Sequence, residues 1–322
     1  MYPYNHKRGQ RIQTNVGGVA VDRAFVAHFQ VAADDATVAD TNGIHAAVAC
    51  TTPALAAAAV VRAASSADDT LTITAPAALG ATPNALSVLL VTADDDALAV
   101  TGDDDEATIT IALANETADN NTAAKIQEAI RLLDEVSGVD VTDFTCAAAG
   151  SWDVAAVETG ETEAVAFEGG QTAAPDVITE GITQPSVPRN ITATAGGTAE
   201  DIAAIQVTVE GTNYADEPIS ETLGAFTEDT AGTVAGNKAF KTVTKITIPA
   251  HANEGATTEI GFGEKLGLPF KLAHNTVLAA YKDNTLETTD PGVTTSATHV
   301  ENNTVDLSNA LNSKVVDVYL IV

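Results

Sequence analysis

The sequence predicts a mainly β protein with β-sandwich-like domains, a small α+β module and one clear helix near residues 122–136. Of its 322 residues, 45% are hydrophobic but only 4% are aromatic, so any core is built mostly from small side chains. Such cores exclude water best when thin β layers pack tightly. Short alternating segments separated by turn residues recur along the chain, as in β-sandwiches. The length predicts two or three compact units.

The first 22 residues are predicted to form a basic N-terminal arm. No Asp or Glu precedes Asp22, whereas the whole chain carries 44 acidic and only 15 basic residues. A cationic leader on an anionic body is suited to lie on an acidic protein surface. The residues that we expect to make this contact are Tyr2, Tyr4, Lys7, Arg8 and Arg11.

The net charge of −29 argues against two classes of partner. Nucleic acid and anionic membrane would both repel the body over a Debye length of about 8 Å at physiological salt. In molar salt that length falls to about 3 Å, and a carboxylate-rich surface keeps its hydration shell. We therefore expect no nucleic-acid or membrane partner. We favour a protein adapted to a hypersaline medium, with an acidic mesophilic surface protein as the alternative.

Residues 23–67, together with residues 189–322, are assigned to a β-rich base. Residues 23–31 alternate as in a strand, and His28 within it is interpreted as a half-buried imidazole with a hydrogen bond. Between Asp34 and Ala67, a polar turn is followed by an alanine-rich stretch that Pro53 breaks and that is compatible with a short helix. Short alternating segments continue from residue 189, and the apolar end, residues 314–322, predicts a central strand whose removal unfolds the domain.

Residues 68–170 are predicted to be an inserted α+β module. Alternating segments at residues 70–74, 86–91, 97–100 and 107–113 predict strands. In the helix, Thr122 is the expected N-cap and Gly138 the expected stop. A further strand is expected over residues 139–144. Residues 171–188 contain three prolines and are predicted to be a linker or a strand-exchange segment.

Motifs of known enzymes are missing from the sequence: it has no G-x-S-x-G, H-E-x-x-H, Walker A or CxxC pattern. Gly261, Gly263 and Gly267 have the wrong spacing for a dinucleotide loop and are read as tight turns between strands. Cys50 and Cys146 are either buried small hydrophobes or one disulfide bridge. We therefore assign no catalytic residue, no cofactor and no metal.

Two other features have competing interpretations. The acidic runs at residues 94–96 and 103–106 are more consistent with solvated hairpin tips than with a Ca²⁺ loop, because they lack the alternating ligand pattern. Trp152 is interpreted as a core residue, with a surface platform for sugar as the alternative. The N-x-[ST] triplets at Asn115, Asn120, Asn190 and Asn302 stay open.

Several blocks of the chain resemble structural proteins of tailed viruses. Residues 80–91, 122–130 and 167–170 resemble a β-rich module inserted in head and tail proteins, and residues 210–223 and 238–248 resemble a block common in phage structural proteins. Residues 265–281 and 305–322 resemble head-decoration proteins. With the acidic composition, the resemblance implies a haloarchaeal or bacterial siphovirus-like source.

The resemblance implies a non-enzymatic virion protein on the capsid exterior that decorates or cements the shell. Its expected partners are the major capsid protein and further copies of itself, with a trimer favoured because a closed oligomer can clamp several coat subunits at once. A tail-tube or tail-tip subunit is the alternative within the virion. A surface adhesin or carbohydrate-binding module is the alternative outside it.

Overall fold

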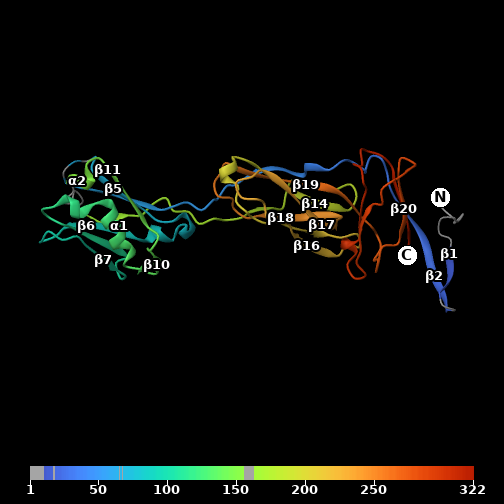
Figure 1. Cartoon of the computed structure of the whole chain (residues 1–322), viewed down its shortest axis with the longest axis horizontal. Coiled ribbons are helices and arrows are strands. Elements are labelled where there is room, and N and C mark those ends of the chain that lie inside the picture. Colours follow the sequence, from blue (N-terminus) through green and yellow to red (C-terminus); the bar gives the residue numbers. More distant parts are fainter. Residues whose placement is uncertain (1–10, 17–18, 65, 67, 156–162) are drawn as a thin grey trace. The chain divides into compact units, whose positions relative to one another are not determined.

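A computed structural model describes residues 11–16, 19–64, 66, 68–155 and 163–322 (Figure 1). Across these residues the protein is mainly β, with several antiparallel sheets and one helix of seven residues or more. The predicted fold class is therefore confirmed.

The chain divides into two compact units, which we call the base unit (Met1–Thr51 and Pro175–Val322) and the inserted unit (Thr52–Ala174). This division differs from the sequence-based boundaries at both joints. Residues 52–67 belong to the inserted unit because β4 (Ala58–Arg62) pairs with β5 (Thr70–Thr74) there. The predicted 171–188 linker is split, and its β13 (Asp176–Ile178) pairs with β18 (Thr242–Ile248) of the base unit.

Two sheets of the base unit enclose its larger core. The first has the order β13-β18-β15-β16, with β15 at Thr208–Thr212 and β16 at Pro218–Thr222. The second has the order β17-β14-β19-β23-β22, and a further strand, β3, pairs with β19. Its strands are β17 (Gly232–Phe240), β14 (Arg189–Gly197), β19 (Ala256–Gly267), β23 (Thr304–Asp306), β22 (Gly292–Thr294) and β3 (Asp40–Ala49). Ile191, Ile260 and Ile246 from the two sheets share this core, which gives the expected sandwich.

A third sheet of the base unit contains both the first described strand and the last one. Its order is β1-β2-β24-β20-β21. The strands are β1 (Arg11–Val16), β2 (Val19–Val31), β24 (Val316–Ile321), β20 (Val277–Lys282) and β21 (Thr285–Leu286). β24 lies between β2 and β20, so the prediction of a central C-terminal strand is confirmed. Its Val318 packs with Leu266 of β19 and Val305 of β23 in a second core.

The glycines of residues 261–267 lie inside the long strand β19, so the prediction of tight turns there is wrong. A Cβ at Gly261 would collide with the backbone of Asp40 and Thr41, where the register between the paired strands β3 and β19 shifts. A Cβ at Gly263 would meet the Asn190 amide. The glycines are thus explained by close approach of neighbouring chain segments rather than by turning.

The inserted unit packs two sheets around a separate core that contains Leu71, Ile111, Ile126 and Trp152. One sheet is antiparallel with the order β11-β5-β4, where β11 is Thr145–Ala149. The other has the order β12-β6-β8-β7 and includes one parallel pair, β6 with β8. Its strands are β12 (Val165–Ala166), β6 (Ser87–Thr92), β8 (Thr108–Leu113) and β7 (Ala99–Asp103). The alanine-rich stretch forms β4, so the short helix considered for it is wrong.

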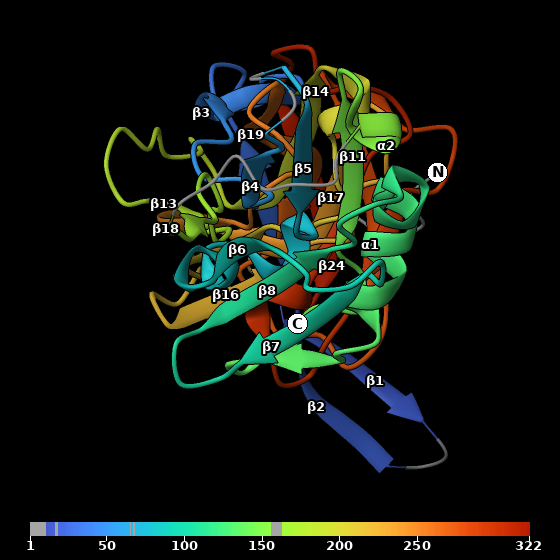
Figure 2. The same cartoon turned by 90° about the vertical axis from the view of Figure 1, so that its left-hand side faces the viewer.

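Helix α1 (Ala123–Arg131) runs beside β7 and β11 and is shorter than predicted (Figure 2). The Thr122 hydroxyl accepts from the Lys125 N–H, which confirms the predicted N-cap. Gly138 does not stop the helix. With Ser137 it adopts positive φ in the turn between β9 (Glu135–Val136) and β10 (Val139–Asp140), a two-residue hairpin. The strand expected over residues 139–144 is limited to β10.

The remaining short helices do not change this architecture. They are α2 (Trp152–Ala155) and the 3₁₀ turns Ala77–Leu79, Thr82–Ala85, Ala118–Asn121, Ala199–Asp201 and Val300–Asn302. No helix within the described ranges has both the length and the apolar character to cross a membrane.

Candidate docking surfaces

The N-terminal hairpin of the base unit has strand edges without a partner in the part of the chain that the structure describes. β1 pairs with residues Val19 to Phe25 of β2, and β24 pairs only with Val26–Val31 of the same strand. Among the described strands, neither the outer edge of β1 nor the second edge of Val19–Phe25 has a partner. The hairpin extends past the remaining strands of the base unit in both views (Figures 1 and 2). Unpaired edges of this kind are templates for another chain.

The structure locates one of the five predicted arm residues. Arg11 is the first residue of β1. Tyr2, Tyr4, Lys7 and Arg8 lie outside the described residues. The arm was predicted over residues 1–22, and in the structure its described part consists of β1 and the start of β2, which pair with each other rather than form a single extended leader.

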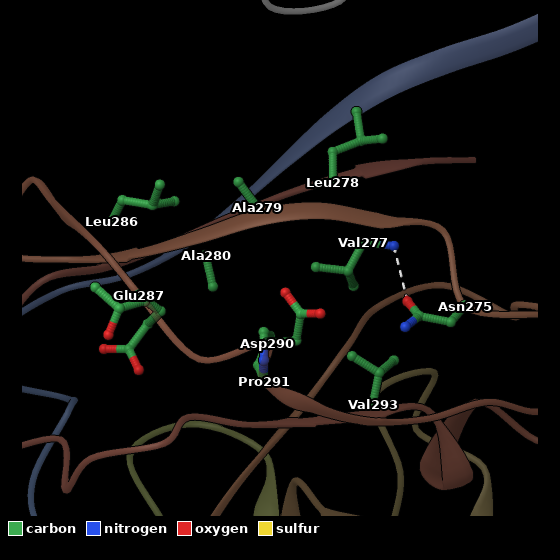
Figure 3. Close-up of a pocket in the computed structure, with 11 residues that line it drawn as sticks. Asn275, Val277, Leu278, Ala279, Ala280, Leu286, Glu287, Asp290, Pro291 and Val293 are labelled. Carbon is green, nitrogen blue, oxygen red and sulfur yellow. Dashed lines mark hydrogen bonds between the residues drawn. The ribbon is translucent and has the colours of Figure 1, made fainter. Parts of the chain in front are cut away.

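A second surface lies beside β20, at the other end of the same sheet (Figure 3). It is a groove of about 470 Å³ between β20 and the segment that leads into β22. Its lining residues are Asn275, Val277, Leu278, Ala279, Ala280, Leu286, Glu287, Thr288, Asp290, Pro291 and Val293. Sequence reasoning missed this groove, because its walls are β20 and the segment before β22, and their positions relative to each other are set only by the folded sheet.

The acidic run at residues 103–106 lies at the tip of the β7–β8 hairpin, as expected. The run at residues 94–96 connects β6 to β7, which both flank β8 and do not pair, so the prediction of a hairpin tip is wrong there. Part of the charge of both runs is used within the inserted unit. The Asp96 carboxylate accepts from the Thr117 hydroxyl at 2.6 Å and from the Thr117 N–H at 2.8 Å. These hydrogen bonds lower the pKa of Asp96. Asp104 accepts from the Ser137 N–H at 2.7 Å. Within the described ranges, no group of three or more His, Cys, Asp or Glu residues is placed to hold a metal ion.

His28 and His251 are held in structural environments. The His28 Nε2 lies 2.6 Å from Asp317 Oδ1, which confirms a half-buried imidazole with a hydrogen bond. Buried His251 accepts from the Ala203 N–H through Nδ1, so its proton lies on Nε2, which faces the Thr258 hydroxyl. Burial lowers the pKa of His251, and Asp176 partly opposes this effect.

Trp152 and the two cysteines belong to the interior rather than to a surface. Trp152 is fully buried, and its Nε1 donates to the Asn121 carbonyl at 3.0 Å, which confirms the core interpretation and removes the sugar platform. Both cysteines are free. Burial raises the pKa of Cys146 to about 12, so its thiol stays protonated and unreactive. Among the open N-x-[ST] sites, Asn190 is buried and its amide is hydrogen-bonded on both sides.

One buried cation was not foreseen from the sequence. The Arg189 guanidinium is fully buried, donates from Nη1 to the Thr37 carbonyl at 2.8 Å and lies 4.5 Å from the centre of the Phe262 ring. Burial lowers the pKa of Arg189 to about 10 despite the opposing charge of Glu264. This residue fixes the segment before β3 onto β14 and β19, so its role is structural.

Comparisons of the chain with protein-family models, curated proteins and solved structures find no match. The inference of function therefore depends on the structure and the sequence alone. Three features bear on it: the strand edges of the β1–β2 hairpin without a described partner, the groove beside β20 and the acidic surface.

Proposed function

We propose that this chain is a non-enzymatic structural protein of a tailed virus, which decorates the capsid exterior and cements it. The observation that carries the proposal is the β1–β2 hairpin, in which the outer edge of β1 and the second edge of Val19–Phe25 have no partner among the described strands. A two-stranded hairpin is marginally stable by itself in water. Such a hairpin is therefore best explained as an element that becomes ordered against a neighbouring subunit.

The charge distribution supports a protein partner for this arm. The residues before Asp22 include Lys7, Arg8 and Arg11 and no acid, whereas the rest of the chain is strongly acidic. Each exposed ion pair contributes at most about 1 kcal/mol, and less in salt. Backbone pairing and the two tyrosines at positions 2 and 4 must therefore provide most of the affinity for the major capsid protein.

Repetition strengthens weak contacts of this kind. A closed homo-oligomer, most simply a trimer, presents several arms to several coat subunits, and linked binding events exceed the affinity of each single one. Cementing a shell needs no catalytic group.

The first test locates the protein in virus particles. Mass spectrometry of purified virions should detect the chain, and cryo-electron microscopy should place it on the outer surface of the head. Density in the tail instead would favour the second candidate, a tail-tube subunit, to which the open hairpin edges are equally suited. Absence of the chain from virions would refute both roles.

The second test addresses the arm. Full-length protein and a variant lacking residues 1–16 are added to empty heads assembled from the coat protein of the same virus, and binding is measured by co-sedimentation. The truncated protein should stay folded and lose binding. A triple variant, Lys241→Gln with Lys245→Gln and Lys314→Gln, removes the same number of basic side chains from exposed surface pairs and should bind normally. Undiminished binding by the truncated protein would contradict the role of the arm.

A further inference from the structure

The strand β20 has one edge that is only partly covered. β24 pairs with it from Val277 to Lys282 on one side. On the other side, β21 pairs only with Tyr281 and Lys282, and the Glu287 N–H donates to the Ala280 carbonyl. No described strand pairs with Val277–Ala279 on that side. An edge of this kind can accept a further strand.

The groove of about 470 Å³ lies along this open edge, and both apolar and polar side chains line it (Figure 3). Val277 and Ala280 point into it from β20, and Val293 faces them from the opposite wall. Leu278 and Leu286 border it and are each 46% exposed, which places them among the most exposed large hydrophobic side chains described. An added strand would cover apolar surface here as well as satisfy backbone groups.

The groove is also negatively charged. Glu287 and Asp290 are among its lining residues, and no Lys or Arg lines it. The Glu287 carboxylate is held by the N–H and hydroxyl of Ser308, whereas Asp290 is exposed. The segment that fits must therefore be an extended strand with an apolar face and a positive charge.

This chain itself carries such a segment. β1 alternates Ile12, Thr14 and Val16 with polar residues in its sequence, begins at Arg11 and follows the basic leader. Neighbouring strands in the order β1-β2-β24-β20 are all antiparallel. A second copy can continue this sheet if its β1 lies beside β20 of the first copy. In that arrangement β1 runs antiparallel to β20, as all neighbouring strands in this order do.

We propose that β1 of a second copy adds to the open edge of β20 and covers the groove between β20 and β22. This inference rests on the proposed function and deepens it, because it names the contact that joins the decorating subunits. A head-to-tail contact uses two different surfaces and closes into a ring when the rotation between copies allows it. The leader before β1 then stays available for the coat.

The first experiment measures the oligomeric state of the full chain by sedimentation velocity at several protein concentrations. Wild-type protein should form a concentration-dependent oligomer. Leu278→Arg with Leu286→Arg, and separately removal of residues 1–16, should both give monomer. The control, Val177→Arg with Leu132→Arg, changes two exposed apolar residues elsewhere and should assemble as wild type. A wild-type monomer, or an oligomer that survives both changes, would overturn the inference.

A charge swap tests the polar component. Arg11→Asp and Asp290→Arg should each weaken association about fivefold, the effect of losing an exposed pair worth about 1 kcal/mol, and the combined variant should recover most of it. Glu254→Arg, at an exposed acid outside the groove, is the matched control and should change nothing. No recovery in the combined variant would count against pairing between these two regions.

A cross-linking experiment tests adjacency directly. Cys50 and Cys146 are first replaced by Ala in both batches of protein. One batch then carries a single cysteine at a position from 12 to 16, the other carries Leu278→Cys, and the two are mixed and oxidised. Disulfides form only when Cα atoms approach within about 7 Å, so the yield of cross-linked dimer should alternate along β1. Thr222→Cys on β16 replaces Leu278→Cys as the control and should give no dimer.

The outcomes separate the two proposals. Monomeric protein that still binds heads through its arm would overturn strand exchange and leave the decorating role standing. A ring that shows the predicted cross-links but is absent from virions would support strand exchange and overturn the decorating role.

Discussion

His28 on β2 and Asp317 on β24 form a hydrogen bond in which Nε2 and Oδ1 are 2.6 Å apart, across 289 residues of sequence. Gln30 donates to the same carboxylate oxygen at 2.7 Å, and the His28 ring stacks on Tyr319 with centroids 4.7 Å apart. These contacts join the first long strand of the base unit to its last one. The sheet that bears the docking surfaces thus depends on the C-terminal strand.

Deletion of residues 316–322 should therefore unfold the base unit and leave the inserted unit intact. All five tyrosines belong to the base unit and the single tryptophan, Trp152, belongs to the inserted unit. Near-ultraviolet circular dichroism from tyrosine should be lost, while tryptophan fluorescence keeps its buried spectrum. Deletion of Val322 alone, which is 40% exposed, is the control and should be tolerated. Retained tyrosine signal in the longer deletion would contradict a structural role for β24.

The inserted unit should fold by itself. Residues 52–174 have a separate core in which Trp152, Phe144 and Phe167 are fully or almost fully buried. The excised fragment is expected to unfold cooperatively in urea with a blue-shifted tryptophan spectrum in its native state. Trp152→Phe removes the hydrogen bond to the Asn121 carbonyl and some volume, and should cost about 1–3 kcal/mol. A fragment without a cooperative transition would show that its core needs the base unit.

Asn303→Ala should destabilise the base unit by about 2–4 kcal/mol, because it leaves several buried backbone groups without a partner. The buried Asn303 amide accepts from the Leu272 and Ser296 N–H groups and donates to the Ser296 and His299 carbonyls. Urea unfolding followed by tyrosine circular dichroism measures the change. Asn309→Ala, at an exposed amide, should cost less than about 0.5 kcal/mol. Equal effects of the two substitutions would contradict this assignment.

The base unit should lose stability as the pH falls through the ordinary pKa of histidine. Because burial lowers the pKa of His251 in the folded state, the unfolded chain binds the proton first. The contribution of His251 is therefore complete above about pH 6.5 and declines below it, until the lowered pKa is passed. His251→Gln should flatten the pH dependence of the unfolding free energy between about pH 7.5 and 5, whereas His274→Gln, at an exposed position, should not. An unchanged slope in His251→Gln would contradict this sign.

Thermal stability should rise steeply from dilute buffer to molar KCl. The described Lys–carboxylate pairs, such as Lys241–Asp216 and Lys245–Glu210, are partly exposed and contribute little stability. The remaining carboxylates leave a net charge of −29 and repel one another. Salt shortens the Debye length from about 8 Å to about 3 Å and so weakens the repulsion among carboxylates. Melting curves over a KCl series test this. A flat response would favour an acidic mesophilic protein.

Local features were predictable because their causes are local. Thr122 precedes a periodic apolar stripe, so the helix start follows from capping chemistry. Trp152 is large and apolar enough to be placed in a core. The apolar alternation of the last residues indicates a strand, and its position at the centre of a sheet follows from the need to cover both of its edges.

The features that sequence reasoning missed depend on distant pairing. The glycines of β19 have no local signature that separates close strand crossing from a turn, since the contact of Gly261 with Asp40 spans more than 200 residues. The alanine-rich β4 becomes a strand only because β5 lies beside it. The docking surfaces were predictable in part. Charge alone predicts the arm, which stays a prediction, whereas the groove needs the register of β20 against β21 and β24.

The two ends of the inserted unit are held together by their own backbone. The Ala174 N–H donates to the Thr52 carbonyl at 3.0 Å, and Leu55 exchanges two hydrogen bonds with Gln171. Because the chain enters and leaves the inserted unit at neighbouring points, another domain whose termini are equally close can replace this unit without distorting the base unit. The base unit is thereby suited to carry an enzyme or an epitope in place of the native module.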